Sequence, residues 1–196
     1  MELSGNALTT LEEAKSFLGI DSGDTSQDDL LKFFINSASD FIEQTCSRKF
    51  GKVEISENVD GTSTQSLLLS RFPIIGITSI TSDGILVDSA EYKIYSESGK
   101  VFRDKGWSFG NQNIAVVYTA GYVLPKDADP DADPPVERSL PFDIEVACLK
   151  LVGAALNKKE AEGVKNGSAG NLSINFGDGI DKAVLTILNN YKTYHV

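Results

Sequence analysis

The spacing of hydrophobic residues changes twice along this 196-residue chain, and this change constrains the fold more than any other feature. Up to about residue 47, apolar residues recur every three or four positions, as on one face of a helix, and they do so again from residue 140. Between residues 48 and 124 they alternate with a period of two, which is typical of β-strands. We therefore expect an α+β fold. An α-helical core of about four helices (residues 1–47 and 140–196) carries an antiparallel β insertion (48–124) between its second and third long helical segments.

Two helices are expected before the insertion. Thr10 and Glu13 have the spacing of a capping box, and Gly19 ends the short helix that follows. The buried stripe expected on the second helix is Leu30, Phe33, Phe34, Ala38, Phe41 and Ile42. Leu31 and Ile35 add apolar surface beside this stripe, so the helix needs cover on more than one side, from a large core or from a neighbouring subunit.

The insertion is expected to form several short antiparallel strands around a core of its own. Asp83-Gly84 and Ser98-Gly99 supply turn residues, and Trp107 and Phe109 are expected to fill the small core. The alternating residues are Val53 and Ile55, Leu67 and Leu69, Tyr92 and Ile94, and Ile114, Val116 and Tyr118.

An acidic, proline-rich loop (125–139) follows the insertion, and a helix is expected to begin near Pro141. The small residues at 153–155 would let another helix approach closely, and the helix that carries Phe33 is the obvious candidate. The expected buried face of the new helix is Ile144, Ala147, Cys148, Leu151 and Ala155.

The segment 162–179 is rich in glycine and is expected to be a flexible loop, after which Asp178 can cap a last helix. One face of that helix carries Ile180, Ala183, Val184, Ile187, Leu188, Tyr191 and Tyr194. A helix of about 15 residues is marginal by itself, so this face must dock on something. Packing on the chain's own core and binding to a partner require the same periodicity, and the sequence does not separate them.

The sequence offers little for catalysis. The only histidine is His195, next to the last residue, and Cys46 and Cys148 fall in expected helices, where buried reduced thiols are the ordinary outcome. The alternating aspartates of 127–133 could meet a calcium ion, but this loop lacks the glycine and glutamate of an EF-hand and is better interpreted as a solvated connector. We expect no catalytic residue, no metal and no cofactor, and therefore no enzyme.

The formal net charge of −10 opposes binding to nucleic acid, because such affinity depends largely on lysine and arginine. No apolar run approaches the roughly 18 residues of a membrane-spanning helix, and the first residues lack the pattern of a signal peptide. We therefore expect a protein that is made in the cytoplasm and does not enter a membrane.

Several segments together resemble the head-tail connector (adaptor, or head-completion) proteins of tailed bacteriophages. The resemblance covers about residues 8–50 and 114–160, and the insertion departs from the smallest members of that family, which lack so large a β segment. The matching segments are LTTLEEAKSFLGID (8–21), DDLL (28–31), FIEQTCSRKF (41–50), YTAGY (118–122) and LPFDI (140–144).

The resemblance implies a structural virion protein at the head–tail interface. It implies a dodecameric ring under the portal protein, which extends the channel for double-stranded DNA without binding it specifically and offers a platform to a stopper or tail-completion protein. It leaves open whether the free protein is a monomer. The residues expected to bind the portal are Val184, Ile187, Leu188, Tyr191 and Tyr194, and those expected at the subunit interface are Leu31, Phe34 and Ile35.

Two other functions are compatible with the sequence. A carbohydrate- or surface-binding β module would use Trp107, Phe109 and Tyr122 as an aromatic platform, and it requires an exposed Trp107. A small hydrolase would use the acidic loop with a metal, and it requires measurable binding of calcium or magnesium.

Overall fold

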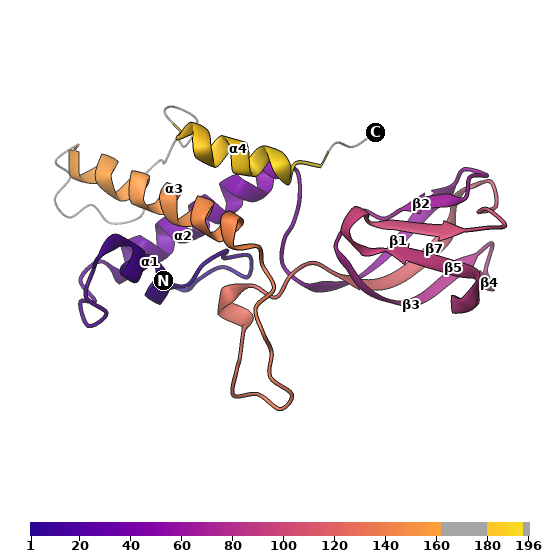
Figure 1. The fold of residues 1–196 in the computed structure, drawn as a ribbon, viewed down its shortest axis with the longest axis horizontal. Coiled ribbons are helices and arrows are strands. Elements are labelled where there is room, and N and C mark those ends of the chain that lie inside the picture. Colours follow the sequence, from indigo (N-terminus) through magenta and orange to yellow (C-terminus); the bar gives the residue numbers. More distant parts are fainter. Residues whose placement is uncertain (162–179, 194–196) are drawn as a thin grey trace. The chain divides into compact units, whose positions relative to one another are not determined.

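The chain divides into two compact units in the computed structural model, which describes residues 1–161 and 180–193 (Figure 1). The helical unit comprises Met1–Phe50 and Val123–Val196, and the β unit comprises Gly51–Tyr122. The described residues form four α-helices and two antiparallel sheets, which confirms the α+β fold. The segment 162–179, expected to be a flexible loop, lies outside the described residues.

The helices of the helical unit are α1 (Leu11–Leu18), α2 (Asp28–Cys46), α3 (Phe142–Ala161) and α4 (Lys182–Asn190). The capping box that precedes α1 is present: the Thr10 hydroxyl accepts from the backbone N–H of Glu13, and the Glu13 carboxylate accepts from that of Thr10. Gly19 ends the helix with φ of 70°, as its sequence position predicts. The N-cap of α4 is Asp181, so this helix begins later than Asp178 would place it.

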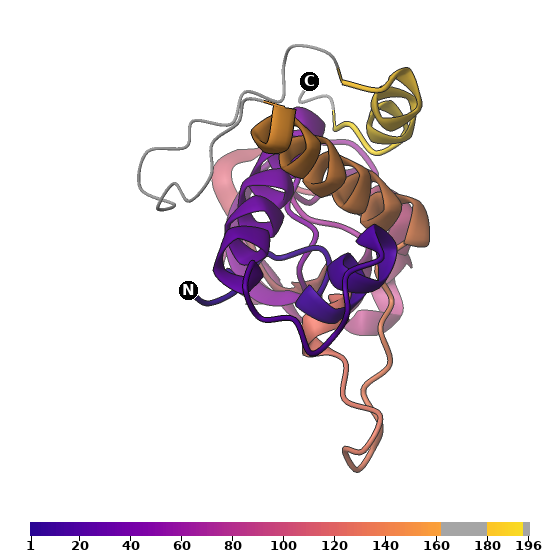
Figure 2. The same ribbon diagram turned by 90° about the vertical axis from the view of Figure 1, so that its left-hand side faces the viewer.

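Helix α3 packs against the three other helices (Figures 1 and 2). Lys150 Nζ lies 3.3 Å from Asp181 Oδ2, and the Tyr191 hydroxyl donates to Asp143 at 2.8 Å, so α4 runs antiparallel to α3. Helix α3 packs most extensively on α2, as expected from the small residues at 153–155, although Gly153 itself lies next to Leu18 of α1.

The buried side of α2 is shifted from the stripe that the sequence predicts. Polar residues belong to it: Ser39 Oγ accepts from the backbone N–H of Leu8 at 3.0 Å, and Glu43 accepts from Asn6 Nδ2 at 2.8 Å. The N-terminal segment therefore covers one side of α2 while α3 covers another, which moves Leu30, Phe33 and Phe41 to half-exposed positions. The buried set is Leu31, Phe34, Ile35, Ala38, Ser39, Ile42, Glu43 and Cys46.

The β unit consists of two antiparallel sheets. The first has the strand order β1-β7-β3-β4 and the second β2-β6-β5. The strands are β1 (Val53–Gly61), β2 (Ser66–Leu68), β3 (Ile74–Ser82), β4 (Ile85–Leu86), β5 (Tyr92–Tyr95), β6 (Lys100–Arg103) and β7 (Gly110–Ala120). The long β7 pairs with β1 on one side, where Val53 faces Ala120, and with β3 on the other, where Ile80 faces Val116.

The sheets enclose a hydrophobic core that belongs to the β unit alone. Trp107 is 2% exposed and lies in this core with Val101, Ile114 and Tyr118. The Tyr118 hydroxyl donates to Glu57 Oε1 at 2.8 Å and accepts from the backbone N–H of Arg71 at 3.1 Å, so the buried phenol is satisfied. The core therefore contains the expected tryptophan.

The chain passes from the helical unit to the β unit after Phe50 and returns after Tyr122. These two crossing points lie next to each other. A bridge joins Gly51 to Tyr122, and the backbone N–H of Lys52 donates to the carbonyl of Tyr122 at 2.8 Å. Just before the first crossing, Phe50 is fully buried in the helical unit, and its backbone N–H donates to Glu43 at 3.2 Å. The β unit is thus an insertion whose entry and exit are held together.

Candidate functional site

The three residues expected at a subunit interface lie inside the subunit. Leu31, Phe34 and Ile35 have no exposed surface in the chain. Other parts of the chain cover them, so the excess of apolar residues on α2 is buried within the subunit and offers no atoms to a neighbour. The expectation of a subunit interface at these residues is therefore wrong.

The face expected to bind the portal is divided between core and surface. Val184 and Leu188 are buried against the chain's own helices, whereas Ile187 and Tyr191 are half-buried. Leu185, which the periodicity did not single out, is exposed. Tyr194 lies outside the described residues. The outer surface of α4 is therefore available for binding, while its inner surface holds it in place.

Helix α3 also presents apolar side chains to solvent. Phe142 is 70% exposed, and Val146 lies one turn further along the same side of the helix. The guanidinium of Arg138 lies 4.2 Å from the centre of the Phe142 ring. The pattern of buried positions predicts only one apolar side of this helix, although the i, i+4 spacing of Phe142 and Val146 is a signal in the sequence for a second.

The buried carboxyl group of Glu145 lies beneath this region, beside the half-exposed carboxyl group of Glu13. Glu145 of α3 is 5% exposed; its Oε2 lies 2.6 Å from Arg138 Nη1, and its Oε1 accepts from the Thr9 hydroxyl at 3.2 Å. Glu13 of α1 also accepts from Thr9, at 3.2 Å. Burial raises the pKa of Glu145 to about 7, and the neighbouring Glu13 adds to the increase. Burial also works to raise the pKa of Glu13, but its hydrogen bonds with Glu145, Thr10 and Thr9 lower it overall.

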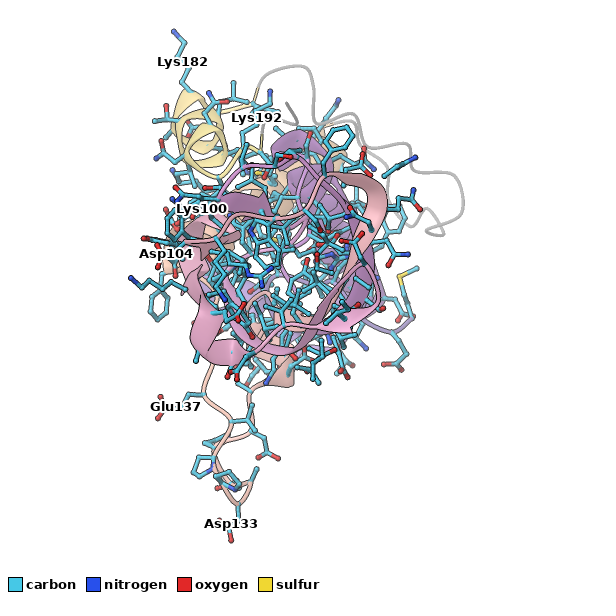
Figure 3. All side chains as sticks on the ribbon, turned by 90° about the vertical axis from the view of Figure 1, so that its right-hand side faces the viewer. Lys100, Asp104, Asp133, Glu137, Lys182 and Lys192 are labelled. Carbon is cyan, nitrogen blue, oxygen red and sulfur yellow. The ribbon has the colours of Figure 1, made fainter. Side chains whose placement is uncertain are left out.

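The acidic, proline-rich loop is a structured arm. Its base is closed where the backbone N–H groups of Ser139 and Leu140 donate to the carbonyl of Val123, at 3.0 and 3.2 Å. Further out, Asp129 and Val136 exchange two backbone hydrogen bonds of 2.9 and 2.8 Å. We call residues 127–137 the acidic arm; Figure 3 shows Asp133 and Glu137 projecting from it.

The β unit exposes an apolar tip at the end of its first sheet that is remote from Gly51 and Tyr122. Ile85 and Leu86 are exposed in the short strand β4, and Phe109 is 83% exposed just before β7. The expectation that Phe109 fills the core is wrong. The Ser108 hydroxyl donates to Asp83 at 2.5 Å, which fixes the loop before Phe109 to the turn before β4 and leaves this ring outside.

The ionisable groups of the described residues include two buried cysteines. Burial raises the pKa of Cys46 to about 11 and that of Cys148 to about 12, so both are thiols at neutral pH. In residues 1–161 and 180–193 no cluster of histidine, cysteine or carboxylate side chains could hold a metal ion. His195 lies outside the described residues. Within those same ranges, no helix is long and apolar enough to cross a membrane.

Comparison with known proteins gives the family. The sequence profile described as "Head completion protein" matches residues 7–194, which is most of the chain. The chain belongs to the head completion protein family. It is therefore a structural component of a virion, with the role of a head–tail connector. No curated protein matches the chain.

Solved structures with the same fold come from gene transfer agent particles. A chain from the neck of an empty particle, computed with C6 symmetry, has a TM-score of 0.57 at 14% identity and is matched over 100% of the present chain and 95% of its own length. A chain from the neck of a native particle, computed with C12 symmetry, has a TM-score of 0.56 at 14% identity, with 100% and 94% covered. A chain from the virion of the native particle has a TM-score of 0.55 at 15% identity, with the same coverage. The match includes the β unit, so this insertion is part of a fold found in other neck proteins.

The burial of Trp107 bears on the alternative of a carbohydrate-binding module. The proposed aromatic platform needs the indole at the surface, but Trp107 is in the core of the β unit while Phe109, two residues further on, is exposed. The match to the head completion family, over residues 7–194, includes the β unit that would carry this platform.

Proposed function

We propose that this chain is one subunit of a ring in the neck of a tailed-phage-like particle, where it lies between the portal protein and the next tail component. The observation that carries this proposal is the full-length likeness to a neck protein whose structure was computed with C12 symmetry. A ring of twelve subunits would continue the channel through which DNA leaves the head. Its lower side would receive a stopper or tail-completion protein.

The outer surface of α4 is the proposed contact with the portal. Val184 and Leu188 fix this helix on the subunit, and Leu185 and Ile187 then present apolar atoms on an amphipathic helix, which is a common way to bind a groove. The exposed pair Phe142 and Val146 on α3 is the proposed contact with a neighbouring subunit.

The net negative charge of the chain is compatible with a channel through which DNA passes. Twelve copies would carry twelve times the formal charge of −10, and a negatively charged lumen repels the phosphates of the passing duplex. DNA would then meet few sites at which it could bind and stop. The subunit would carry out no reaction.

Electron microscopy of the purified chain, with and without the portal protein of the same particle, tests the proposal. We expect a closed ring on the portal, and we expect Leu185→Asp to weaken portal binding at least about tenfold while leaving the subunit folded, because it places a charge in an apolar contact. Gln44→Glu, which adds the same charge at an exposed position of α2, is the control. A chain that never occupies the head–tail vertex would contradict the proposal, and an unchanged affinity of Leu185→Asp would contradict the α4 contact.

A further inference from the structure

The outer face of the second β-sheet differs from the rest of this acidic protein. In register, Leu68 faces Lys100 and Lys100 faces Tyr95, while Phe102 faces Lys93, so these five side chains share one face across β2, β6 and β5. The opposite face carries the buried Leu67 and Val101, so the five lie on the outside. We call Leu68, Lys93, Tyr95, Lys100 and Phe102 the lysine–aromatic face.

The lysine–aromatic face carries no carboxylate to balance its two lysines. The strand positions that share it include no aspartate or glutamate, and within the described part of the chain neither lysine makes an ion pair. Lys100 Nζ instead lies 4.2 Å above the ring of Tyr95. Leu68 is 64% exposed and Tyr95 is also exposed. The β unit contributes six basic and eight acidic residues, so it accounts for −2 of the formal −10 and the helical unit for −8.

The acidic arm has the complementary chemistry. Residues 127–137 contain four aspartates, one glutamate and three prolines, and no lysine or arginine. The Asp129–Val136 bridge holds them in an extended hairpin, and the ion pair of Arg138 with Glu145 fixes the end of the arm to α3. Most of its side chains are exposed. Proline-rich extended segments dock on aromatic surfaces with little loss of conformational entropy, and carboxylates pair with lysines.

We propose that the acidic arm of one subunit docks on the lysine–aromatic face of a second copy of this chain. This inference rests on the proposed ring, in which every subunit has a neighbour that supplies one arm and one face. The prolines would lie on Tyr95, Phe102 and Leu68, and the aspartates would pair with Lys93 and Lys100. The β unit would thereby hold neighbouring subunits together.

Cross-linking between two single-cysteine variants tests the contact. Ala132→Cys places a thiol in the arm without changing its charge, and Leu68→Cys places one on the face. Particles assembled from a mixture of the two variants are treated with a short bis-maleimide, so that a linked dimer can form only between different copies. Cys46 and Cys148 are buried thiols of raised pKa and should contribute little background.

We expect covalent dimers from Ala132→Cys with Leu68→Cys, and none when Leu68→Cys is replaced by Ile85→Cys, an equally exposed position on the other sheet. Particles that contain the ring but give no dimer would overturn the docking and leave the proposed function intact. Particles without a ring of this chain would overturn both.

Charge reversal provides the second measurement. Lys93→Glu with Lys100→Glu should lower the yield of rings by about tenfold, because two exposed ion pairs become repulsive contacts. Adding Asp131→Lys and Asp133→Lys should restore the yield. Lys52→Glu with Lys158→Glu makes the same change of charge at two other exposed positions of the subunit and should have little effect. Failure of the arm substitutions to restore the yield would refute the pairing.

Discussion

The buried carboxyl group of Glu145 should make the helical unit less stable as the pH rises. In the folded chain its pKa is about 7, against 4.5 for an ordinary glutamate. Between pH 4.5 and pH 7 the carboxyl group keeps its proton in the folded state but has lost it in the unfolded state. This difference adds to the free energy of unfolding at low pH, and the contribution is lost as the pH rises towards 8. Arg138, Glu13 and Thr9 are the polar groups that face this carboxyl group.

The size of the effect follows from the two pKa values. Between pH 5.5 and pH 8 this single group should lower the free energy of unfolding by about 2 kcal/mol. The neighbouring Glu13, whose pKa is lowered from 4.5, is ionised in both states over this range and adds almost nothing to the change. Glu145→Gln cannot ionise, so the difference in unfolding free energy between the wild type and this variant should fall by about that amount over the same range. Taking the difference cancels carboxyl groups elsewhere, such as Asp83 and Asp181, whose pKa values are lowered by hydrogen bonds.

Urea denaturation at pH 5.5, 6.5 and 8 measures this difference. The helical signal in circular dichroism reports mainly on the helical unit, and the fluorescence of Trp107, the only tryptophan, reports on the β unit. Glu12→Gln changes an exposed carboxyl group next to Glu13 and is the control. A difference between wild type and Glu145→Gln that does not vary with pH would refute the reasoning, as would an equal shift of the tryptophan transition.

Two further substitutions test the assignment of core and surface. Phe34→Asp should prevent the helical unit from folding, because it places a charge at a fully buried position at a cost of more than about 4 kcal/mol. A soluble variant with native circular dichroism would show that this position is not in the core. Phe109→Ser should change the unfolding free energy by no more than about 0.5 kcal/mol, since the ring is 83% exposed. A clear loss of stability in the tryptophan transition would show that Phe109 packs against the β unit.

The alternation of elements could be predicted from the sequence because the two periodicities are local properties. The capping box at Thr10, the turn at Gly19 and the buried face of α3 follow from spacing over a few residues, and the structure contains all three. The position of Trp107 in the β core also follows from its size and apolar character.

The identity of the exposed residues could not be predicted in the same way, since burial depends on what covers a helix. Leu31 and Ile35 looked like excess apolar surface because Ser39 and Glu43, which complete the buried side of α2, are polar and do not appear in a hydrophobic pattern. Their hydrogen bonds to the N-terminal segment are contacts over more than 30 residues of chain. Phe109 lies outside the core because the hydrogen bond from Ser108 to Asp83 fixes the loop before it to the turn before β4. The spacing of residues alone does not reveal this contact.

The shape of the acidic arm also could not be predicted from the sequence. Its composition suggested a solvated connector, and only the pairing of Asp129 with Val136 and the anchoring of Arg138 by Glu145 show that it has a defined shape. The lysine–aromatic face required knowledge of the strand register, because its five residues come from three strands whose order in the sheet, β2-β6-β5, differs from their order in the sequence.

The adjacent crossing points at Gly51 and Tyr122 have a consequence for how such proteins can diversify. Because the backbone bridge brings these two residues together, a short linker could replace the whole segment between them without stretching the helices on either side. Recombination could therefore exchange one inserted module for another while the rest of the subunit stays intact. The same site would accept a fluorescent or affinity domain for labelling the neck of a particle.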